Sequence, residues 1–196
     1  WASYRRIRSF EILVHCTSLS SIYRNCSHWL GEMAKNPQII LIDGPAGSGK
    51  TTLAKKLEEE IKCEVVHLDY LYNGWDDALG ESLTNVLIDL VTDFSSKKDH
   101  LLNIYDWAEN QFNSTRLIKA APTLIIEGVG AGQSAIRDFA ETLYWVEVAP
   151  EIGLKRVLER DGISIESQMR RWQEREAKHF ELERTREYAD FIISTT

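Results

Sequence analysis

The amino-acid sequence predicts an α/β protein with three layers, in which helices cover both faces of a five-stranded parallel sheet, and three observations support this fold class. Short apolar runs rich in β-branched residues alternate with amphipathic segments of helical period, as in strands joined by crossover helices. A glycine-rich loop, residues 44–51, joins the first apolar run to the first helical segment. Acidic residues follow two of the later runs, at the edge where parallel sheets place functional groups. We expect the strands near residues 39–43, 64–69, 123–127, 143–148 and 190–193.

Length, composition and charge suit one globular domain. The 196 residues are 43% hydrophobic and 27% charged, which is enough apolar material for a substantial core. The net charge of −7 argues against a general nucleic-acid-binding surface, and no apolar run reaches the length of a membrane span. The cysteines, Cys16, Cys26 and Cys63, are too sparse and odd in number for a secreted disulfide framework, so we expect a reducing cytosol.

Residues 1–36 precede the first predicted strand and differ from the rest of the chain in charge. Their five basic and two acidic side chains give a net charge of +3. We expect a helical or partly ordered extension, followed by the main domain at residues 37–196. A targeting segment is another interpretation, although Glu11 and His15 interrupt the apolar part and argue against a signal peptide.

The glycine-rich loop reads Gly44-Pro45-Ala46-Gly47-Ser48-Gly49-Lys50-Thr51, the G-x-x-x-x-G-K-[ST] pattern of a phosphate-binding loop. The apolar run before it and the helical segment after it supply the strand and the helix that such a loop needs. Glycine lets successive N–H groups point inward, where the positive end of the helix also favours a polyphosphate. Lys50 supplies a charge for the β- and γ-phosphates, and the Thr51 hydroxyl suits Mg²⁺. We expect the nucleotide to contact Gly44, Pro45, Ala46, Gly47, Ser48, Gly49, Lys50, Thr51 and Thr52.

Asp69 stands at the carboxyl end of the second predicted strand, where an open α/β sheet places functional groups. The run after it, residues 70–77, is aromatic, acidic and glycine-bearing, which is typical of an active-site loop. We expect Asp69 to accept the proton of a substrate hydroxyl, and a helix or turn cap is the alternative. His67 lies within the strand, and we interpret it as a packed or surface residue.

The middle of the chain offers a helix and a candidate contact for a second substrate. Residues 83–94 have apolar side chains at helical spacing. Further on, Tyr105-Asp106-Trp107 combines aromatic faces that stack on a ring with a carboxylate that binds hydroxyls, and ordinary packing is the alternative. Ser96-Lys97-Lys98-Asp99 resembles the guanine-reading element of GTPases, but it follows no β-type run, so we reject that class.

Charged residues follow the later strands as well. Glu127 ends the third strand beside the expected phosphate loop, and we predict that it holds Mg²⁺ together with Thr51. Two helical segments after the fourth strand carry arginines, whose forks suit phosphate oxygens and the charge that develops on a transferred phosphoryl group. Because glutamates are interleaved with them, we expect one to three to be functional, in the order Arg160, Arg156, Arg171 and Arg170.

Taken together, these motifs resemble the uridine kinase branch of the P-loop nucleoside and nucleotide kinases, over residues 39–193. The motifs that carry the resemblance are GPAGSGKT, Asp69-Tyr70-Leu71-Tyr72, Tyr105-Asp106-Trp107, Ile126-Glu127-Gly128, Arg160-Asp161 and the final YADFII. One departure is the segment Ala108-Glu109-Asn110-Gln111, which stands where the family has a histidine and an arginine.

The resemblance implies roles and a topology. Asp69 would be the catalytic base, Tyr105 and Asp106 would contact the nucleoside, and Arg160 with Arg170 or Arg171 would hold the transferred phosphate. The strand order would be 2-3-1-4-5, with a short lid around residues 161–175.

The sequence thus predicts an ATP-dependent kinase that transfers the γ-phosphate to a hydroxyl of a small molecule, with a nucleoside as the leading acceptor. A nucleoside monophosphate kinase and an ATP-binding regulatory protein without phosphotransfer are the alternatives. We expect ATP and Mg²⁺ as cofactors, no nucleic-acid or membrane partner, and no particular oligomeric state. The catalytic residues would be Lys50, Asp69 and Arg160. The substrate-binding residues would be Tyr72, Tyr105, Asp106, Arg156, Arg170 and Arg171.

Overall fold

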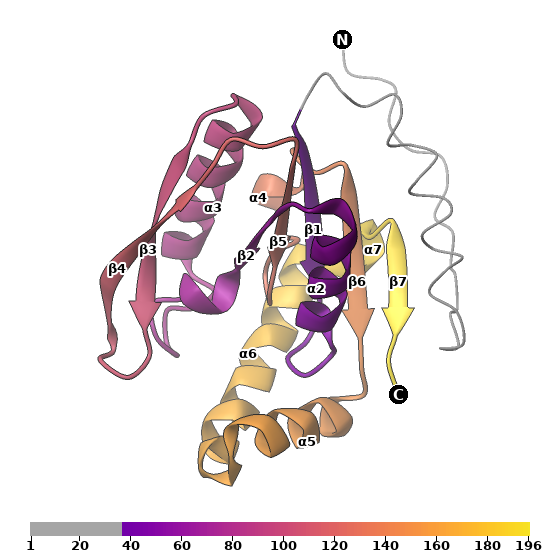
Figure 1. Ribbon diagram of the computed structural model, residues 1–196. Helices are drawn as coiled ribbons and strands as arrows, with labels where there is room; N and C mark the ends of the chain where they lie inside the picture. The colour runs from indigo at the N-terminus through magenta and orange to yellow at the C-terminus, as the bar shows by residue number, and fades with distance from the viewer. Residues whose placement is uncertain (1–36) are drawn as a thin grey trace.

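The computed structural model describes residues 37–196, and the extension predicted for residues 1–36 lies outside them. Five strands form one parallel sheet: β1 (Gln38–Asp43), β2 (Glu64–His67), β5 (Thr123–Glu127), β6 (Thr142–Glu147) and β7 (Phe191–Ser194). Helices pack on both faces of this sheet, as Figure 1 shows. The predicted α/β fold with a five-stranded parallel sheet is confirmed.

The two covered faces follow from the alternation of side chains along the strands. Ile39 and Leu41 of β1 belong to the apolar cluster that includes α3 (Glu81–Ser95), whereas Ile42 packs with α2 (Lys50–Ile61) on the other face. Successive side chains of a strand point to opposite faces, so a strand covered on both sides needs apolar residues at every position. β5 meets that requirement in full, since all five of its residues are buried.

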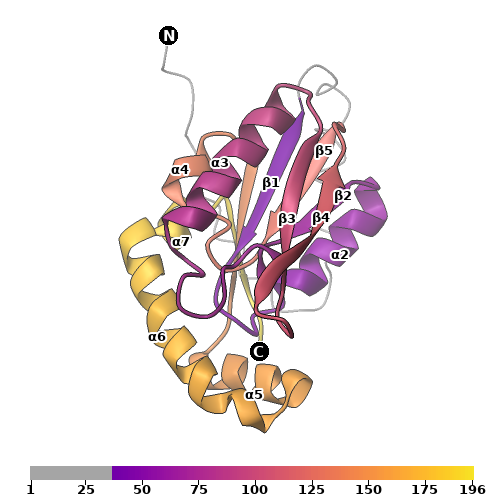
Figure 2. The same ribbon diagram turned by 90° about the vertical axis from the view of Figure 1, so that its left-hand side faces the viewer.

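The remaining helices follow β5 and β6. They are α4 (Ser134–Arg137), α5 (Pro150–Asp161), α6 (Glu166–Glu183) and α7 (Thr185–Tyr188), with short 3₁₀ turns η1 (Leu68–Tyr70) and η2 (Ile163–Ile165). The predicted lid region, residues 161–175, is the turn between α5 and α6 together with the first half of α6. Figure 2 shows α5 and the adjoining part of α6 below the lower end of the sheet, whereas the rest of α6 runs up beside the sheet toward α7. No helix within residues 37–196 has the length and hydrophobicity that crossing a membrane requires.

A β-hairpin that the sequence did not predict lies apart from the main sheet. β3 (His100–Asp106) and β4 (Gln111–Ile118) pair antiparallel as a two-stranded sheet of their own. Most side chains of β4 are exposed, so the strand lacks the apolar alternation that marks a half-buried strand. β4 is recognised as a strand by its hydrogen bonds to β3, because its own sequence shows no strand pattern. Tyr105 and Asp106 therefore stand at the end of a strand.

The strand order of the main sheet is β2-β5-β1-β6-β7 and not 2-3-1-4-5 when all seven strands are numbered along the chain, although the five predicted strands, numbered among themselves, have the expected neighbours. The hairpin strands β3 and β4 come between β2 and β5 in the chain, so the strand that pairs with both β1 and β2 is the fifth and not the third. The prediction counted only five strands because the polar hairpin gave no strand signal.

All five parallel strands end at the same edge of the sheet, and the functional motifs follow that edge. The phosphate loop comes after β1, η1 with Asp69 comes after β2, and Glu127 closes β5. Helix α5 and the first part of α6, which carry the predicted arginines, lie beyond the same edge (Figure 1). The fold therefore gathers motifs that are far apart in the sequence.

Candidate active site

The phosphate loop is packed so closely that two of its glycines have no substitute. At Gly44, with φ of 141°, a Cβ atom would stand 2.0 Å from the carbonyl oxygen of Val146 on β6. At Gly47, with φ of 74°, it would stand 2.3 Å from the carbonyl oxygen of Gly153 on α5. Lys50 donates hydrogen bonds of 2.9 Å from Nζ to the carbonyl oxygens of Gly44 and Pro45. The motif glycines thus keep the loop in contact with both neighbouring elements.

The loop opens onto a cavity of about 560 Å³, a volume within the usual range of small-molecule binding sites. Residues from the donor side, from the loop after β2 and from the α5–α6 region line it together. They are Ala46, Gly47, Gly49, Lys50, Thr51, Thr52, Asp69, Tyr72, Trp75, Trp107, Glu127, Gly128, Val129, Arg156, Val157, Arg160, Asp161, Ile165, Met169 and Trp172. All three predicted catalytic residues, Lys50, Asp69 and Arg160, are therefore brought to one cavity.

Glu127 joins the phosphate loop to the second strand. This residue is 4% exposed, and its Oε1 accepts a hydrogen bond of 3.1 Å from the Thr51 hydroxyl. The same oxygen lies 2.5 Å from Nδ1 of His67, which faces Glu127 in the β2–β5 register. This hydrogen bond is the main reason why the pKa of His67 is raised. The two residues predicted to hold Mg²⁺, Thr51 and Glu127, are thus in direct contact.

Asp69 lies in η1 at the cavity wall. Asp69 is exposed toward the cavity, and desolvation by the protein packed around it disfavours the charged carboxylate and raises its pKa. The positive charges of Lys50 and Arg160 oppose that rise. The backbone carbonyl oxygen of Asp69 accepts a hydrogen bond of 2.8 Å from the indole N–H of Trp107, at the end of the hairpin. A carboxylate in this position can accept a proton from a hydroxyl group bound in the cavity.

Aromatic side chains form the wall of the cavity near Asp69. The ring of Trp75 lies edge-on to Trp107 at 5.3 Å and to Trp172 at 6.0 Å between centroids, and Trp172 lies 5.4 Å from Tyr72. Tyr72, a predicted substrate residue, lines the cavity with its ring while its hydroxyl donates to the carbonyl oxygen of Val129. Flat apolar faces of this kind suit a ring-shaped ligand.

The predicted arginines divide into two groups. Arg160 and Arg156 line the cavity. Arg160 makes two hydrogen bonds of 2.7 Å to the carboxylate of Asp161, and Arg156 donates to the carbonyl oxygen of Gly47. Arg170 and Arg171 are exposed on α6 and do not line it, and Arg170 pairs with Glu166.

Tyr105 and Asp106 lie beside the cavity and not in its lining. Tyr105 is buried and stacks edge-on against Trp107 and Phe112. The Asp106 carboxylate accepts hydrogen bonds from Asn113 and from the backbone of the hairpin turn, which lower its pKa. Their contact with the acceptor stays a prediction, whereas Trp107 from the same motif faces the cavity.

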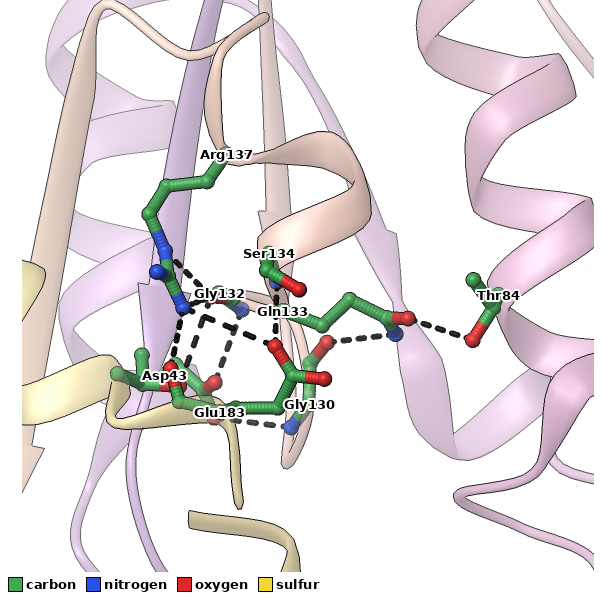
Figure 3. A network of polar contacts seen from close by, with 9 residues as sticks. Asp43, Thr84, Gly130, Gly132, Gln133, Ser134, Arg137 and Glu183 are labelled. Carbon is green, nitrogen blue, oxygen red and sulfur yellow. Dashed lines mark hydrogen bonds and ion pairs between the residues drawn. The ribbon is translucent and has the colours of Figure 1, made fainter. Parts of the chain in front are cut away.

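A buried carboxylate holds the phosphate loop to the loop that follows β5. Asp43, the last residue of β1, is fully buried and accepts hydrogen bonds from the backbone N–H groups of Gly44, Gly130 and Gly132. Figure 3 shows Asp43 within the wider network that includes Arg137 and Glu183. This network fixes the wall that carries Gly128 and Val129.

Sequence reasoning missed two contacts made by α6. Oε2 of Glu176, whose side chain is 4% exposed, accepts a hydrogen bond of 3.0 Å from the backbone N–H of Ala46. Arg175 donates to the carbonyl oxygen of Trp75 and to the carboxylate of Asp76. Both residues stand in a charged run that reads as a solvated helix face, so no local pattern distinguishes them.

Comparison with known proteins places the chain in a family. A family model described as an AAA domain matches residues 40–181. The chain belongs to this family. It is 26% identical to a uridine kinase of Limosilactobacillus reuteri over 183 aligned positions, which cover 81% of this chain and 84% of that protein. It is 27% identical to a cytidylate kinase of Pyrobaculum arsenaticum over 164 positions, which cover 79% and 76%.

A solved structure agrees with this assignment at the level of the fold. It is described as a possible uridine kinase from Bacillus stearothermophilus, and it matches with a TM-score of 0.60 at 20% identity, over 88% of this chain and 96% of that one. The chain is an ATP-dependent kinase of the P-loop nucleoside and nucleotide kinase superfamily, as its motifs predicted.

Proposed function

We propose that this kinase transfers the γ-phosphate of ATP to a hydroxyl group of a small metabolite, with a nucleoside as the acceptor. The observation that carries the proposal is the convergence of Lys50, Asp69 and Arg160 on one cavity that also has an aromatic wall. Phosphoryl transfer needs a positioned donor, an acceptor hydroxyl next to a base, and positive charge for the transferred group. Each of these three requirements has a residue in the cavity.

On the donor side, backbone N–H groups of the phosphate loop and the Lys50 ammonium bind the phosphates. Thr51 and Glu127 fit a magnesium ion, because their oxygens are of the type that Mg²⁺ prefers and both line the cavity. No group of three or more His, Cys, Asp or Glu side chains within residues 37–196 forms a ligand set, which agrees with an ion that takes its other ligands from phosphates and water. Bound Mg²⁺ would neutralise charge on the phosphates.

On the acceptor side, Asp69 orients the hydroxyl and accepts its proton while the new oxygen–phosphorus bond forms and the bond between the γ-phosphorus and the departing ADP breaks. The rings of Trp75, Trp107 and Trp172 offer faces and edges for stacking a nucleobase. Arg160, whose charge acts on Asp69, would stabilise negative charge on the phosphoryl group as it moves. The uridine kinase of L. reuteri, similar over most of its length, supports a nucleoside as the acceptor.

A screen for acceptor-dependent ADP formation tests the proposal. The protein is supplied with ATP and Mg²⁺ and with nucleosides, nucleoside monophosphates, sugars and sugar acids in turn. We expect a nucleoside to stimulate ADP formation strongly, and Lys50→Ala to abolish the stimulation. ATP binding without stimulation by any acceptor would support a regulatory protein and contradict the proposal.

A nucleoside monophosphate is the second candidate acceptor. Arg156 and Arg160 both line the cavity, and a monophosphate needs such arginines for its own phosphate. The similarity to a cytidylate kinase points in the same direction. In the acceptor screen, stimulation by cytidine monophosphate and not by cytidine would decide for this alternative.

Two further proposals concern the cellular compartment of the protein and its macromolecular partners. We infer a reducing cytosol, since the cysteines of the chain are few and Cys63 is free. Neither a nucleic-acid nor a membrane partner is proposed, because the net charge of −7 disfavours both kinds of anionic surface.

A further inference from the structure

We propose that Glu176 competes with the terminal phosphates of ATP for the phosphate loop, so that ATP binds with the Glu176 carboxyl in its protonated form. The inference rests on one part of the proposed function, the binding of ATP at the phosphate loop, and it does not depend on which acceptor is phosphorylated. It assigns a role to a residue outside every motif of the chain.

The side chain of Glu176, on α6, contacts the phosphate loop, where we propose that ATP binds. α6 runs past the phosphate loop, and the Glu176 side chain reaches from it to the backbone of Ala46, 130 positions away in the sequence. Ala46 is part of the cavity lining, beside Lys50. A carboxylate oxygen thus accepts a hydrogen bond from a backbone N–H of the loop, and in phosphate-binding loops such N–H groups bind phosphate oxygens.

The two acceptors exclude each other for chemical reasons. One N–H group makes one strong hydrogen bond, so a phosphate oxygen at Ala46 has to replace Oε2 of Glu176. A displaced carboxylate would remain close to the negative phosphates in a place sheltered from water, where like charges repel strongly. A protonated carboxyl group removes this repulsion and can donate its own hydrogen bond to a phosphate oxygen.

Burial makes the protonated form accessible. Desolvation raises the pKa of Glu176 to about 7, although the hydrogen bond from Ala46, the charge of Lys50 and a hydrogen bond from the Trp172 side chain oppose the rise. The negative charge of Asp43, across the phosphate loop, adds to it. The titratable groups that interact with the carboxyl from other parts of the fold are therefore Lys50 on α2, Asp43 on β1 and Tyr72 after η1. Near neutral pH, both forms of Glu176 are populated.

The sign of the pH effect follows directly. Below its pKa the carboxyl is neutral and ATP displaces it easily, whereas above its pKa each binding event has to take up a proton. For a group of pKa about 7, the dissociation constant of ATP should rise about tenfold between about pH 6 and pH 8. The nucleotide's own ionisation is the same for every variant, so the ratio of two proteins isolates the contribution of Glu176.

The experiment is calorimetric titration of the whole chain with Mg-ATP, without acceptor, at several pH values across this range. We expect the dissociation constant of the wild type, divided by that of Glu176→Gln, to rise about tenfold from about pH 6 to pH 8. The matched control is Glu174→Gln, since Glu174 is exposed on the same helix. The corresponding ratio for this variant should stay constant.

Two further measurements keep the test decisive. Titration of the wild type in buffers of different ionisation enthalpy should show uptake of a proton near pH 8 that Glu176→Gln lacks. Glu176→Ala serves as a second variant if the glutamine variant does not fold. A constant ratio across the pH range would overturn the proposal and leave Glu176 as a structural cap of the loop. If no acceptor stimulates ADP formation but the predicted pH effect on ATP affinity is observed, only the proposed function is contradicted.

Discussion

The indole N–H of Trp107 donates a hydrogen bond of 2.8 Å to the backbone carbonyl oxygen of Asp69. This bond connects the end of the β3–β4 hairpin to the turn that carries the proposed base. It also sets Trp107 edge-on to Trp75 on the aromatic wall. The hairpin, which contributes no strand to the main sheet, thus positions the wall of the cavity next to Asp69, where we propose that the acceptor binds.

Trp107→Phe should slow catalysis by loosening that turn. The phenyl ring preserves most of the aromatic surface but loses the donor, and a single hydrogen bond of this kind contributes about 0.5–1.5 kcal/mol. We expect kcat to fall about 2–10-fold with little change in ATP affinity, as measured by steady-state kinetics and calorimetry. Trp145→Phe is the matched control, because it removes an indole hydrogen bond to Glu147 away from the cavity. An unchanged kcat in Trp107→Phe would show that this bond does not position Asp69.

Glu127→Gln should raise the requirement for magnesium. The substitution keeps the shape of the side chain but removes the negative charge that attracts the ion. We expect half-maximal activity at a Mg²⁺ concentration about 10–100-fold higher, a range typical of altered metal surroundings. Glu147→Gln, at the end of β6, which β1 separates from β5, and outside the cavity, should leave the Mg²⁺ dependence unchanged. Equal Mg²⁺ curves for wild type and Glu127→Gln would argue against Glu127 as a ligand.

Gly153→Ala should disturb the phosphate loop from α5. A Cβ atom at Gly153 would stand 2.7 Å from the backbone carbonyl oxygen of Ala46, so the loop or the helix has to shift. Overpacking of this kind costs about 1–3 kcal/mol, and we expect both the thermal stability and the ATP affinity to fall. Lys155→Ala on the exposed face of the same helix provides the control. Normal ATP affinity in Gly153→Ala would mean that α5 does not support the loop.

The sequence could single out the residues of the proposed donor half of the site because their signals are local. Residues 44–51 are continuous, and the strand and helix around them have strong periodic patterns. The same holds for Asp69 and Glu127, each of which directly follows or ends an apolar run. Parallel strands bring such positions to one edge of the sheet, so strand ends predict proximity without any knowledge of contacts.

The acceptor half depends on contacts between distant segments, and these gave no signal. β4 is polar on most of its length, so the hairpin that holds Trp107 was not recognised. His67 was interpreted as a packed or surface residue, yet the β2–β5 register sets it against Glu127. That contact could have been found by pairing the ends of the two strands. Arg175 and Glu176, by contrast, become informative only when α6 is placed against the loops that they touch.

The pH dependence of kcat should reflect the raised pKa of Asp69. Desolvation raises this pKa from its ordinary value, and the base is active only when deprotonated, so kcat falls as the pH drops through the raised value. Measurement at saturating ATP separates this effect from Glu176, which acts on ATP affinity and in the opposite direction. We expect the midpoint of the acid limb to lie above the ordinary aspartate value of about 3.9. A kcat that stays constant down to that value would contradict a desolvated base.

Asp69→Asn tests the two-substrate site most directly. Asparagine has the same shape but accepts no proton, so we expect kcat with the preferred acceptor to fall about 10²–10⁴-fold. The ATP dissociation constant should change little, because the phosphate loop and Lys50 remain intact. Asp138→Asn changes an exposed aspartate at the C-terminal end of α4, outside the cavity, and should behave as the wild type. The decisive measurement is the ratio of kcat to ATP affinity in Asp69→Asn: a large loss of kcat with normal ATP binding is predicted, and a near-wild-type kcat would contradict the account.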